Sequence, residues 1–229
     1  MRALVATLLV LAAAPLAQAR PVGPAAGTAA VMTIAQLQYG GGGDWYANPS
    51  GLPNLLNAIR ARTALPVSDR PAHVKITDPE LWQYPYLYMT GHGNVHFSDV
   101  ELQILRQYLS TGGFLHADDN YGMDASFRRE VVRIFPGAKL VELPKDHPVY
   151  HSFYDFPGGL PKIHKHDGLP AQGFGLFHGG RMVVFYSYES DLGNGWEDPQ
   201  TYGDPPALHE AALRMGVNLF MYAASQVAQ

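Results

Sequence analysis

The chain has 229 residues, no cysteine and a formal net charge of −4 at pH 7. Because cysteine is absent, disulfide bonds, thiolate nucleophiles and thiolate metal ligands are all excluded. There is no run of Lys or Arg, so nucleic acid is not expected as a partner.

The first nineteen residues have the pattern of a secretory signal peptide. Arg2 precedes an apolar run at residues 3–15, which is shorter than the roughly 20 residues of a membrane span. Ala17 and Ala19 occupy the small-residue positions of a cleavage site. We therefore expect an exported protein, periplasmic or secreted, that begins at Arg20 and has no later transmembrane segment.

The remaining chain is predicted to form one domain at residues 31–226, preceded by a flexible start at residues 20–30. Apolar runs and helical spacing alternate along it. Strands are predicted at residues 31–38, 73–77, 86–90, 114–117 and 138–143, and helices at residues 52–59, 98–109, 127–135 and 207–224. Ser50 is a candidate cap of the first helix, and Ser98 with Glu101 matches a capping box.

This alternation, with short connections, predicts an α/β fold with a mainly parallel sheet. The later chain differs from that rhythm. Residues 144–170 are rich in Pro, His and Gly and predict a long irregular segment of functional importance. Two runs at residues 173–178 and 181–188, joined by Gly179 and Gly180, predict a hairpin before the C-terminal helix.

Polar residues follow two consecutive predicted strands. Gly91, His92 and Gly93 end one of them, and Asp118 and Asp119 end the next. Because parallel strands place their carboxyl ends at one edge of the sheet, these residues are expected to share a crevice. Adjacent strands lie about 4.8 Å apart, so the His92 side chain is expected within about 8 Å of an Asp carboxylate.

The catalytic candidates are His92, His116, Asp118 and Asp119. His116 shares a strand face with Asp118, and a His–Asp pair suits acid–base chemistry or a divalent metal ion. Adjacent carboxylates repel each other, so one is expected to have a raised pKa or a cationic partner. We expect one aspartate to form a helix cap or an Asx turn and the other to face the crevice. Replacing the second by Asn is expected to preserve folding and abolish ligand binding.

The predicted ligand-binding residues are Asp44, Trp45, Tyr46, Gly91, Gly93, Asn120, His147 and Glu189. An acid beside two aromatic rings suits a polar ligand with apolar faces, such as a sugar. The preceding run of glycines at residues 40–43 lacks the spacing of a phosphate-binding loop and is interpreted as a sharp turn. The clustered histidines at residues 164–166 lack the ligand spacing of a metal site, and no metal ligand is assigned.

Several longer motifs carry a resemblance. They are Leu37-Gln-Tyr39, Gly42-Gly-Asp-Trp-Tyr46, Leu52-Pro-Asn-Leu-Leu56, Tyr84-Pro-Tyr-Leu-Tyr-Met-Thr-Gly-His-Gly93, Gly112-Gly-Phe-Leu115, Asp118-Asp119 and Asp146-His-Pro148. The chain resembles a bacterial domain-of-unknown-function family that is placed among class I glutamine amidotransferase-like folds. The resemblance implies a flavodoxin-like three-layer sandwich and no established activity.

In that superfamily a nucleophilic cysteine occupies a strand-to-helix elbow. The matching elbow here holds Asp118 to Gly122, so thiolate hydrolysis of glutamine is excluded. A branch of the superfamily that resembles trehalose-utilisation proteins also lacks the cysteine and is linked to carbohydrates, which favours a sugar ligand by analogy.

Three functions follow as hypotheses. The first is binding of a small polar molecule, such as a carbohydrate or a cell-envelope fragment, in the crevice. The second is a hydrolase that uses Asp118 or Asp119 with His92 or His116, with or without a divalent metal ion. The third is an interaction module that binds a protein partner in the cell envelope through Tyr and Trp anchors.

Overall fold

A computed structural model describes residues 31–227. Its centre is a seven-stranded sheet in the order β2-β1-β3-β4-β7-β6-β5. The strands are β1 (Ile34–Leu37), β2 (Ala72–Val74), β3 (Tyr86–Gly91), β4 (Phe114–Asp119), β5 (Val141–Glu142), β6 (Gln172–His178) and β7 (Arg181–Tyr188). Strands β2, β1, β3, β4 and β7 are parallel, whereas β6 runs antiparallel to β7 and β5 antiparallel to β6. The sheet is therefore mainly parallel, as predicted.

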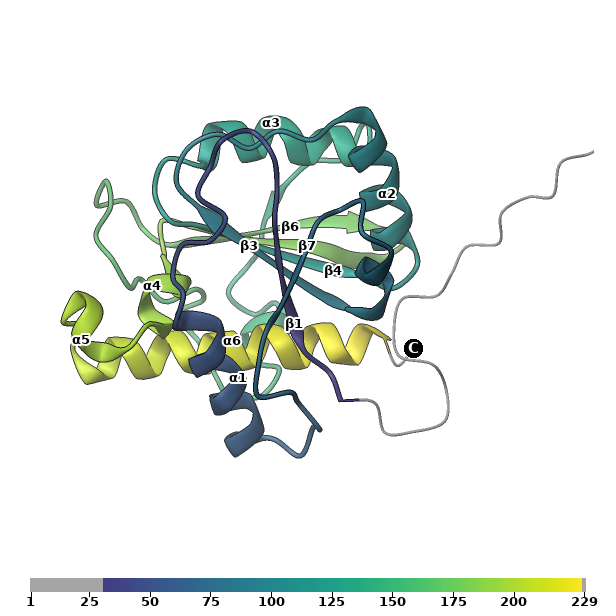
Figure 1. Cartoon of the computed structure of the whole chain (residues 1–229). Coiled ribbons are helices and arrows are strands. Elements are labelled where there is room, and N and C mark those ends of the chain that lie inside the picture. Colours follow the sequence, from purple (N-terminus) through teal and green to yellow (C-terminus); the bar gives the residue numbers. More distant parts are fainter. Residues whose placement is uncertain (1–30, 228–229) are drawn as a thin grey trace, which may run out of the picture.

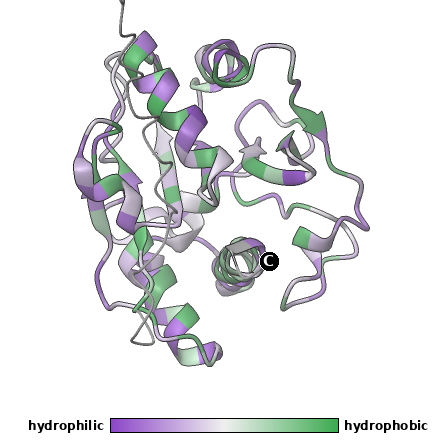
Figure 2. Cartoon of the chain, turned by 90° about the vertical axis from the view of Figure 1, so that its right-hand side faces the viewer, coloured by the Kyte–Doolittle hydropathy of each residue, from purple (hydrophilic) through white to green (hydrophobic). Residues whose placement is uncertain are grey.

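Helices cover both faces of the sheet, which gives an α/β sandwich (Figure 1). The helices are α1 (Gly51–Arg62), α2 (Asp99–Ser110), α3 (Asp124–Ile134), α4 (Leu192–Trp196), α5 (Pro199–Tyr202) and α6 (Pro206–Val227), with 3-10 turns η1 (Pro79–Gln83) and η2 (Pro148–Tyr150). Helices α1 and α6 pack on one face, and α2 and α3 pack on the other. Their colours change between hydrophobic and hydrophilic in Figure 2, as expected for helices with one buried side.

Successive side chains of the central strands point to opposite faces of the sheet and contribute to two hydrophobic cores. In β3, Tyr86 and Tyr88 belong to the core under α1 and α6, and Leu87 and Met89 belong to the core under α2 and α3. All six residues of β3 are buried because helices cover both faces. Within residues 31–227, no helix is long and apolar enough to cross a membrane.

The helix signals in the sequence were partly correct. The capping box is confirmed, since Ser98 Oγ accepts the Glu101 N–H at 3.3 Å and Glu101 Oε2 accepts the Ser98 N–H at 2.8 Å. Ser50 does precede α1, but its side chain makes no cap bond. Instead, Glu197 Oε1 accepts the N–H groups of Ser50 and Gly51, both at 2.8 Å. A distant carboxylate thus caps α1.

Three strand and helix predictions need correction. Strand β4 does not end at residue 117, because Asp118 pairs with Thr90 and Ser187, and Asp119 pairs with Gly91. Strand β5 is reduced to two exposed edge residues. The short helices α4 and α5 were not predicted, since they are stabilised by contacts with remote parts of the chain. Residues 144–170 are irregular apart from η2, as expected.

The parallel strands all end at the carboxyl edge of the sheet, and the strand order shows where along this edge the chain reverses direction. The chain goes from β1 to β2 on one side and then crosses to β3 on the other side. In open α/β sheets, ligands bind at such a reversal, outside the carboxyl ends of the strands. The loops after β1 and β3 therefore occupy the position where a ligand is expected.

Candidate functional site

The loops after β1 and β3 are joined by an aspartate–histidine pair. Asp44 Oδ2 lies 2.9 Å from His92 Nδ1, and Asp44 Oδ1 accepts the backbone N–H of His92. His92 and Asp44 remain 53% and 33% exposed at their side chains. Partial burial acts to raise the Asp44 pKa, but the bonds from the His92 backbone and ring hold it below its ordinary value. The partner of His92 is therefore an ionised Asp44, not Asp118 or Asp119.

Glycines around this pair make room for Tyr39. A Cβ on Gly91 would lie 2.4 Å from the Tyr39 hydroxyl oxygen, and a Cβ on Gly43 would lie 2.5 Å from it. Gly91 also has a φ of +143°, which L side chains rarely adopt. Within the described chain, the buried Tyr39 hydroxyl has no hydrogen-bond partner. Gly91 is thus required by internal packing, whereas the space beside Gly93 is almost open.

Asp119 has the capping role that was expected for one of the two aspartates. Its Oδ1 accepts the backbone N–H groups of Tyr121 at 3.2 Å and Met123 at 3.0 Å. This arrangement fixes the turn that leads into α3. Burial outweighs these bonds and raises the Asp119 pKa above its ordinary value.

One aspartate was expected to face an open crevice, but Asp118 does not, because its side chain is fully buried. Its oxygens accept the N–H of Leu192 at 3.2 Å, the N–H of Gly193 at 2.6 Å and the Ser187 hydroxyl. These bonds attach the start of α4 to the end of β4. Burial, together with the nearby Asp191 carboxylate, raises the Asp118 pKa to about 7.

His116 is also completely buried, on the same face of β4 as Asp118. Its Nδ1 lies 3.1 Å from the Tyr86 hydroxyl, and its Nε2 lies 2.9 Å from Ser187 Oγ. Desolvation lowers the His116 pKa to about 3, so the ring is neutral. Although Ser187 touches both His116 and Asp118, all three are inaccessible to a substrate. The group is an internal polar network rather than a nucleophilic triad.

A second group of polar side chains lies beyond the ends of β4 and β7, centred on Asp191. Asp191 Oδ2 lies 3.1 Å from His164 Nδ1, 3.0 Å from His166 Nε2 and 2.6 Å from Asn194 Nδ2. His164 Nε2 in turn lies 3.0 Å from Asp204 Oδ1. The bond to Asp191 raises the His164 pKa, and for His166 the same attraction outweighs desolvation. Conversely, the two imidazoles overcome the burial of Asp191 and lower its pKa.

Backbone strain is concentrated around this group, which we call the Asp191 cluster (His164, His166, Asp191, Asn194 and Asp204). In the described part of the chain, the non-glycine residues with positive φ are Asn48, Tyr121, His166, Glu189 and Asp191. Contacts link them, since Asn48 Nδ2 lies 3.4 Å from Asn120 Oδ1 and the rings of Tyr121 and His166 are 5.2 Å apart. Buried atoms without a partner also gather here, namely Asn120 Nδ2, His166 Nδ1, Asp191 Oδ1 and Asn194 Oδ1. Such strain needs strong support from the surroundings.

The raised pKa values of Asp118, His164 and His166 predict that the stability of the fold decreases as the pH rises from 6 to 8. Asp118 has a folded pKa of about 7 against an ordinary value of 3.8, so its favourable contribution is complete below pH 3.8 and is lost as the pH passes 7. The contributions of His164 and His166, whose pKa values are raised above 6.5, are lost over the same upper range. We expect the free energy of unfolding in urea to fall, since the lowered pKa values of His116 and His147 offset only part of this loss.

The exposed pair of His151 and Asp155 provides a control for the pH dependence. The pKa of His151 is raised as well, but this pair lies at the surface and outside the Asp191 cluster. The Asp155→Ala variant should retain the decline between pH 6 and pH 8. A free energy of unfolding that is flat or rises with pH in the unmodified protein would contradict this assignment of charges.

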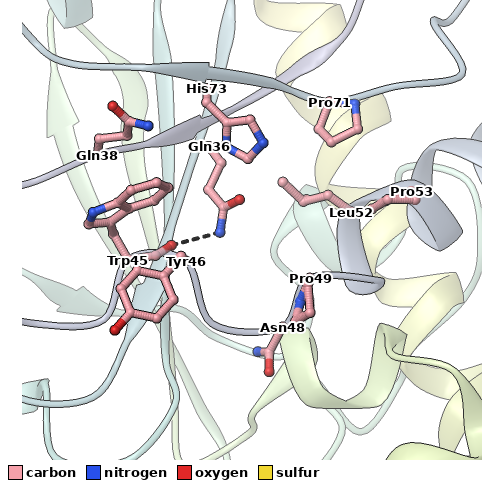
Figure 3. A pocket seen from close by; sticks show the side chains of 10 residues that line it. All are labelled: Gln36, Gln38, Trp45, Tyr46, Asn48, Pro49, Leu52, Pro53, Pro71 and His73. Atoms are coloured by element: carbon pink, nitrogen blue, oxygen red, sulfur yellow. Dashed lines mark hydrogen bonds between the residues drawn. The ribbon is translucent and has the colours of Figure 1, made fainter.

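A pocket of about 340 Å³ opens beside β1 and β2 (Figure 3). It is lined by Gln36, Gln38, Trp45, Tyr46, Asn48, Pro49, Leu52, Pro53, Pro71 and His73. The loop between β1 and α1 contributes Trp45 and Tyr46, whose rings meet edge to face at 5.5 Å. The Gln36 Nε2 donates to the Trp45 carbonyl at 2.7 Å, which fixes the loop against the strand. Two of the predicted ligand-binding residues therefore line a pocket.

The other predicted ligand-binding residues are dispersed. Asp44 lies next to Trp45 in sequence but is not among the residues that line the pocket. Asn120 and Glu189 are almost completely buried near the Asp191 cluster, where Glu189 Oε2 binds Lys162 Nζ at 2.5 Å. His147 lies at the edge of the sheet opposite to the carboxyl edge. Its ring is 6.2 Å from that of Phe177, a residue near the end of β6 that pairs with Met182 near the start of β7. Its Nδ1 accepts the Val149 N–H and caps η2.

Sequence reasoning did not identify Asp191 or Asp204 as members of a cluster. The spacing of His164 and His166 was a visible signal, but their carboxylate partners lie 25 to 40 positions away. Among residues 31–227, no group of three or more His, Asp or Glu side chains has an arrangement that could hold a metal ion. The contacts observed in the cluster are hydrogen bonds between its imidazole and carboxylate groups.

Comparison with curated proteins finds no match. Comparison with protein families finds a match to a family described as "Domain of unknown function (DUF4159)", over residues 33–224. This range includes all seven strands of the sheet and the loops that carry the candidate site residues. The chain therefore belongs to the DUF4159 family.

Proposed function

We infer that this protein binds a small polar ligand with apolar faces, such as a carbohydrate or a cell-envelope fragment, at the carboxyl edge of its sheet. The observation that carries this proposal is the pocket lined by Trp45 and Tyr46 together with the side-chain amides of Gln36 and Gln38. Aromatic rings pack on the C–H faces of a sugar, and amides exchange hydrogen bonds with its hydroxyl groups.

The local structure supports this role. Gln36 Nε2 donates to the Trp45 carbonyl, so a ligand hydroxyl would donate to the side-chain oxygen of Gln36, Oε1. Tyr46 is 65% exposed, which leaves its ring available to a ligand. The pocket volume of about 340 Å³ lies at the small end of the range for binding sites, roughly 300–1,000 Å³. A mono- or disaccharide matches this size.

The proposed setting is an exported protein with a cysteine-free amidotransferase-like fold. Support for the fold comes from the strand order, in which β1 lies between β2 and β3, and from Tyr121, whose φ of +88° follows the end of β4 as at a strand-to-helix elbow. Support for export comes from the signal pattern of residues 1–19, which lie outside the described residues. Because no cysteine is present, thiolate chemistry is not part of the proposal.

Replacing Trp45 by Ala is expected to weaken saccharide binding up to about tenfold, since an aromatic contact contributes roughly 0.5–1.5 kcal/mol beyond its buried area. Binding is measured by saturation-transfer NMR and calorimetry against neutral mono- and disaccharides and a muramidase digest of peptidoglycan. The Gln36→Leu variant should also bind more weakly, because it removes the amide from the pocket floor.

The matched control is Phe153→Ala, which removes an exposed aromatic ring that does not line the pocket. It should bind as the unmodified protein does. The proposal is wrong if no member of the panel binds at millimolar concentration, or if Trp45→Ala and Phe153→Ala bind equally well.

A further inference from the structure

We propose that Asp44 and His92 form a general-base pair that activates water to hydrolyse neutral carboxylic esters at the ends of β1 and β3. The activity does not depend on the ligand in the Trp45 pocket. It differs from an acid–base site at Asp118 and Asp119, because those carboxylates are buried and hold backbone N–H groups.

The geometry of the pair fixes the tautomer of His92. The ionised Asp44 can only accept at 2.9 Å from Nδ1, so the proton of the neutral imidazole lies on Nδ1. This leaves the lone pair on Nε2, for which residues 31–227 provide no hydrogen-bond partner. The ring is 53% exposed, so water and substrate reach Nε2 directly. A histidine that is oriented by a carboxylate in this way is a competent general base.

The backbone keeps the pair in place. Asp44 Oδ1 also accepts the His92 backbone N–H, so both oxygens of the carboxylate bind the same residue. The loop after β1 folds back along the loop after β3, with the His96 N–H donating to the Gly40 carbonyl at 2.9 Å and the Gly43 N–H donating to the Asn94 carbonyl at 3.1 Å. The base is therefore pre-organised between two anchored loops.

Backbone donors lie in the same two loops. Gly41, Gly42 and Gly93 are exposed and have positive φ values. No acceptor for their N–H groups exists among the described residues, whereas the N–H groups of Gly43 and Asp44 are already bonded. Exposed N–H groups of this kind can stabilise the negative charge that develops on an ester carbonyl oxygen.

The residues around His92 select the reaction class. A glycosidase needs two carboxylates on either side of the bond, but Asp118 and Asp191 are buried in the interior. A phosphate ester needs cationic partners, and in the described chain no Lys or Arg side chain contacts Asp44 or His92. The nearby Arg129 is held by Glu130 at 3.0 Å and by the Val95 carbonyl at 2.9 Å. A neutral acyl ester, such as an O-acylated hydroxyl compound, requires neither.

The steps balance without a further reactant. His92 Nε2 takes a proton from water as the water oxygen attacks the acyl carbon, and the carbonyl π electrons move to oxygen. When the tetrahedral intermediate collapses, the bond from carbon to the alcohol oxygen breaks. The imidazolium returns its proton to the departing alkoxide, giving a carboxylic acid and an alcohol.

The test uses p-nitrophenyl acetate and the folded mature chain. His92→Gln keeps the backbone N–H that binds Asp44 but removes the base, and we expect its rate to fall about 100-fold, a typical general-base contribution. Asp44→Asn should fall at least about tenfold, because the wrong tautomer is favoured. His96→Gln is the matched control, since His96 is exposed on the same loop and has no carboxylate within hydrogen-bond distance. It should retain the full rate.

Equal rates in His92→Gln and His96→Gln would overturn the proposal. A second measurement avoids variants altogether, because long-range proton–nitrogen NMR of the unmodified protein reports the His92 tautomer. The expected result is a protonated Nδ1 and a bare Nε2, and a protonated Nε2 would also overturn it. Saccharide binding is measured by calorimetry and ester hydrolysis by release of p-nitrophenol, so failure of one proposal is distinguishable from failure of the other.

Discussion

Replacing Asp191 by Ala is expected to lower the free energy of unfolding by about 3–5 kcal/mol, as removal of one member of a buried ion pair does. The carboxylate accepts from His164, His166 and Asn194 and is almost completely buried. Without it, the imidazoles lose the negative charge that raises their pKa values. Equilibrium unfolding in urea at pH 6 measures the loss.

Asp155→Ala is the matched control because it breaks another aspartate–histidine pair, with His151, at the surface. Exposed pairs contribute little to stability, so this variant should unfold at the same urea concentration as the unmodified protein. If Asp191→Ala proves as stable as Asp155→Ala, the Asp191 cluster does not hold the irregular segment against the sheet.

Gly91→Ala is expected to lower the free energy of unfolding by about 3 kcal/mol. Two effects add, because the residue has a φ of +143° and its new Cβ would lie 2.4 Å from the Tyr39 hydroxyl oxygen. Strained backbone costs roughly 1–3 kcal/mol, and overpacking costs a further 1–3 kcal/mol. The thermal midpoint should fall accordingly, and chemical denaturation gives the size of the change.

Gly93→Ala separates these two effects. Gly93 has a φ of +85°, but its nearest neighbour to a new Cβ is the Gly43 Cα at 3.9 Å. Only the backbone strain applies, and we expect a loss of about 1 kcal/mol. Equal losses in the two variants would show that Tyr39 moves aside and that its position does not depend on Gly91.

Much of the fold was predictable because its signals are local. The Ser98–Glu101 capping box, the glycines at residues 112 and 113 and the Gly179–Gly180 turn lie within a few residues of the elements they define. The strand predicted at residues 138–143 is shorter than expected, because only Val141 and Glu142 pair with β6. Helix α4 is fixed by Asp118, more than 70 positions away in the chain, so its own five residues give little signal.

The predicted residues His92 and Asp119 do lie at the ends of neighbouring strands, but the hydrogen-bond partner of His92 is a different residue. Adjacent pairing of β3 and β4 is confirmed, and Gly91 is the register partner of Asp119. His92 lies one residue beyond that pairing, where the loop after β1 folds back and brings Asp44 to it. The sequence gives the strand ends but not the path of a loop. The partners of Asp191 were missed for the same reason, since they come from two separate irregular segments.

The most direct test of ligand binding uses the indole N–H signals in a proton–nitrogen NMR spectrum of the whole protein. The chain has three tryptophans, and only Trp45 lines the pocket. Trp196 is buried and donates its Nε1–H to the Ala212 carbonyl at 2.8 Å, so its signal is an internal reference. Titration with a saccharide that binds should move the Trp45 signal, identified by its absence in Trp45→Phe, and leave those of Trp82 and Trp196 in place. Binding of the saccharide with an unmoved Trp45 signal would contradict the proposed site.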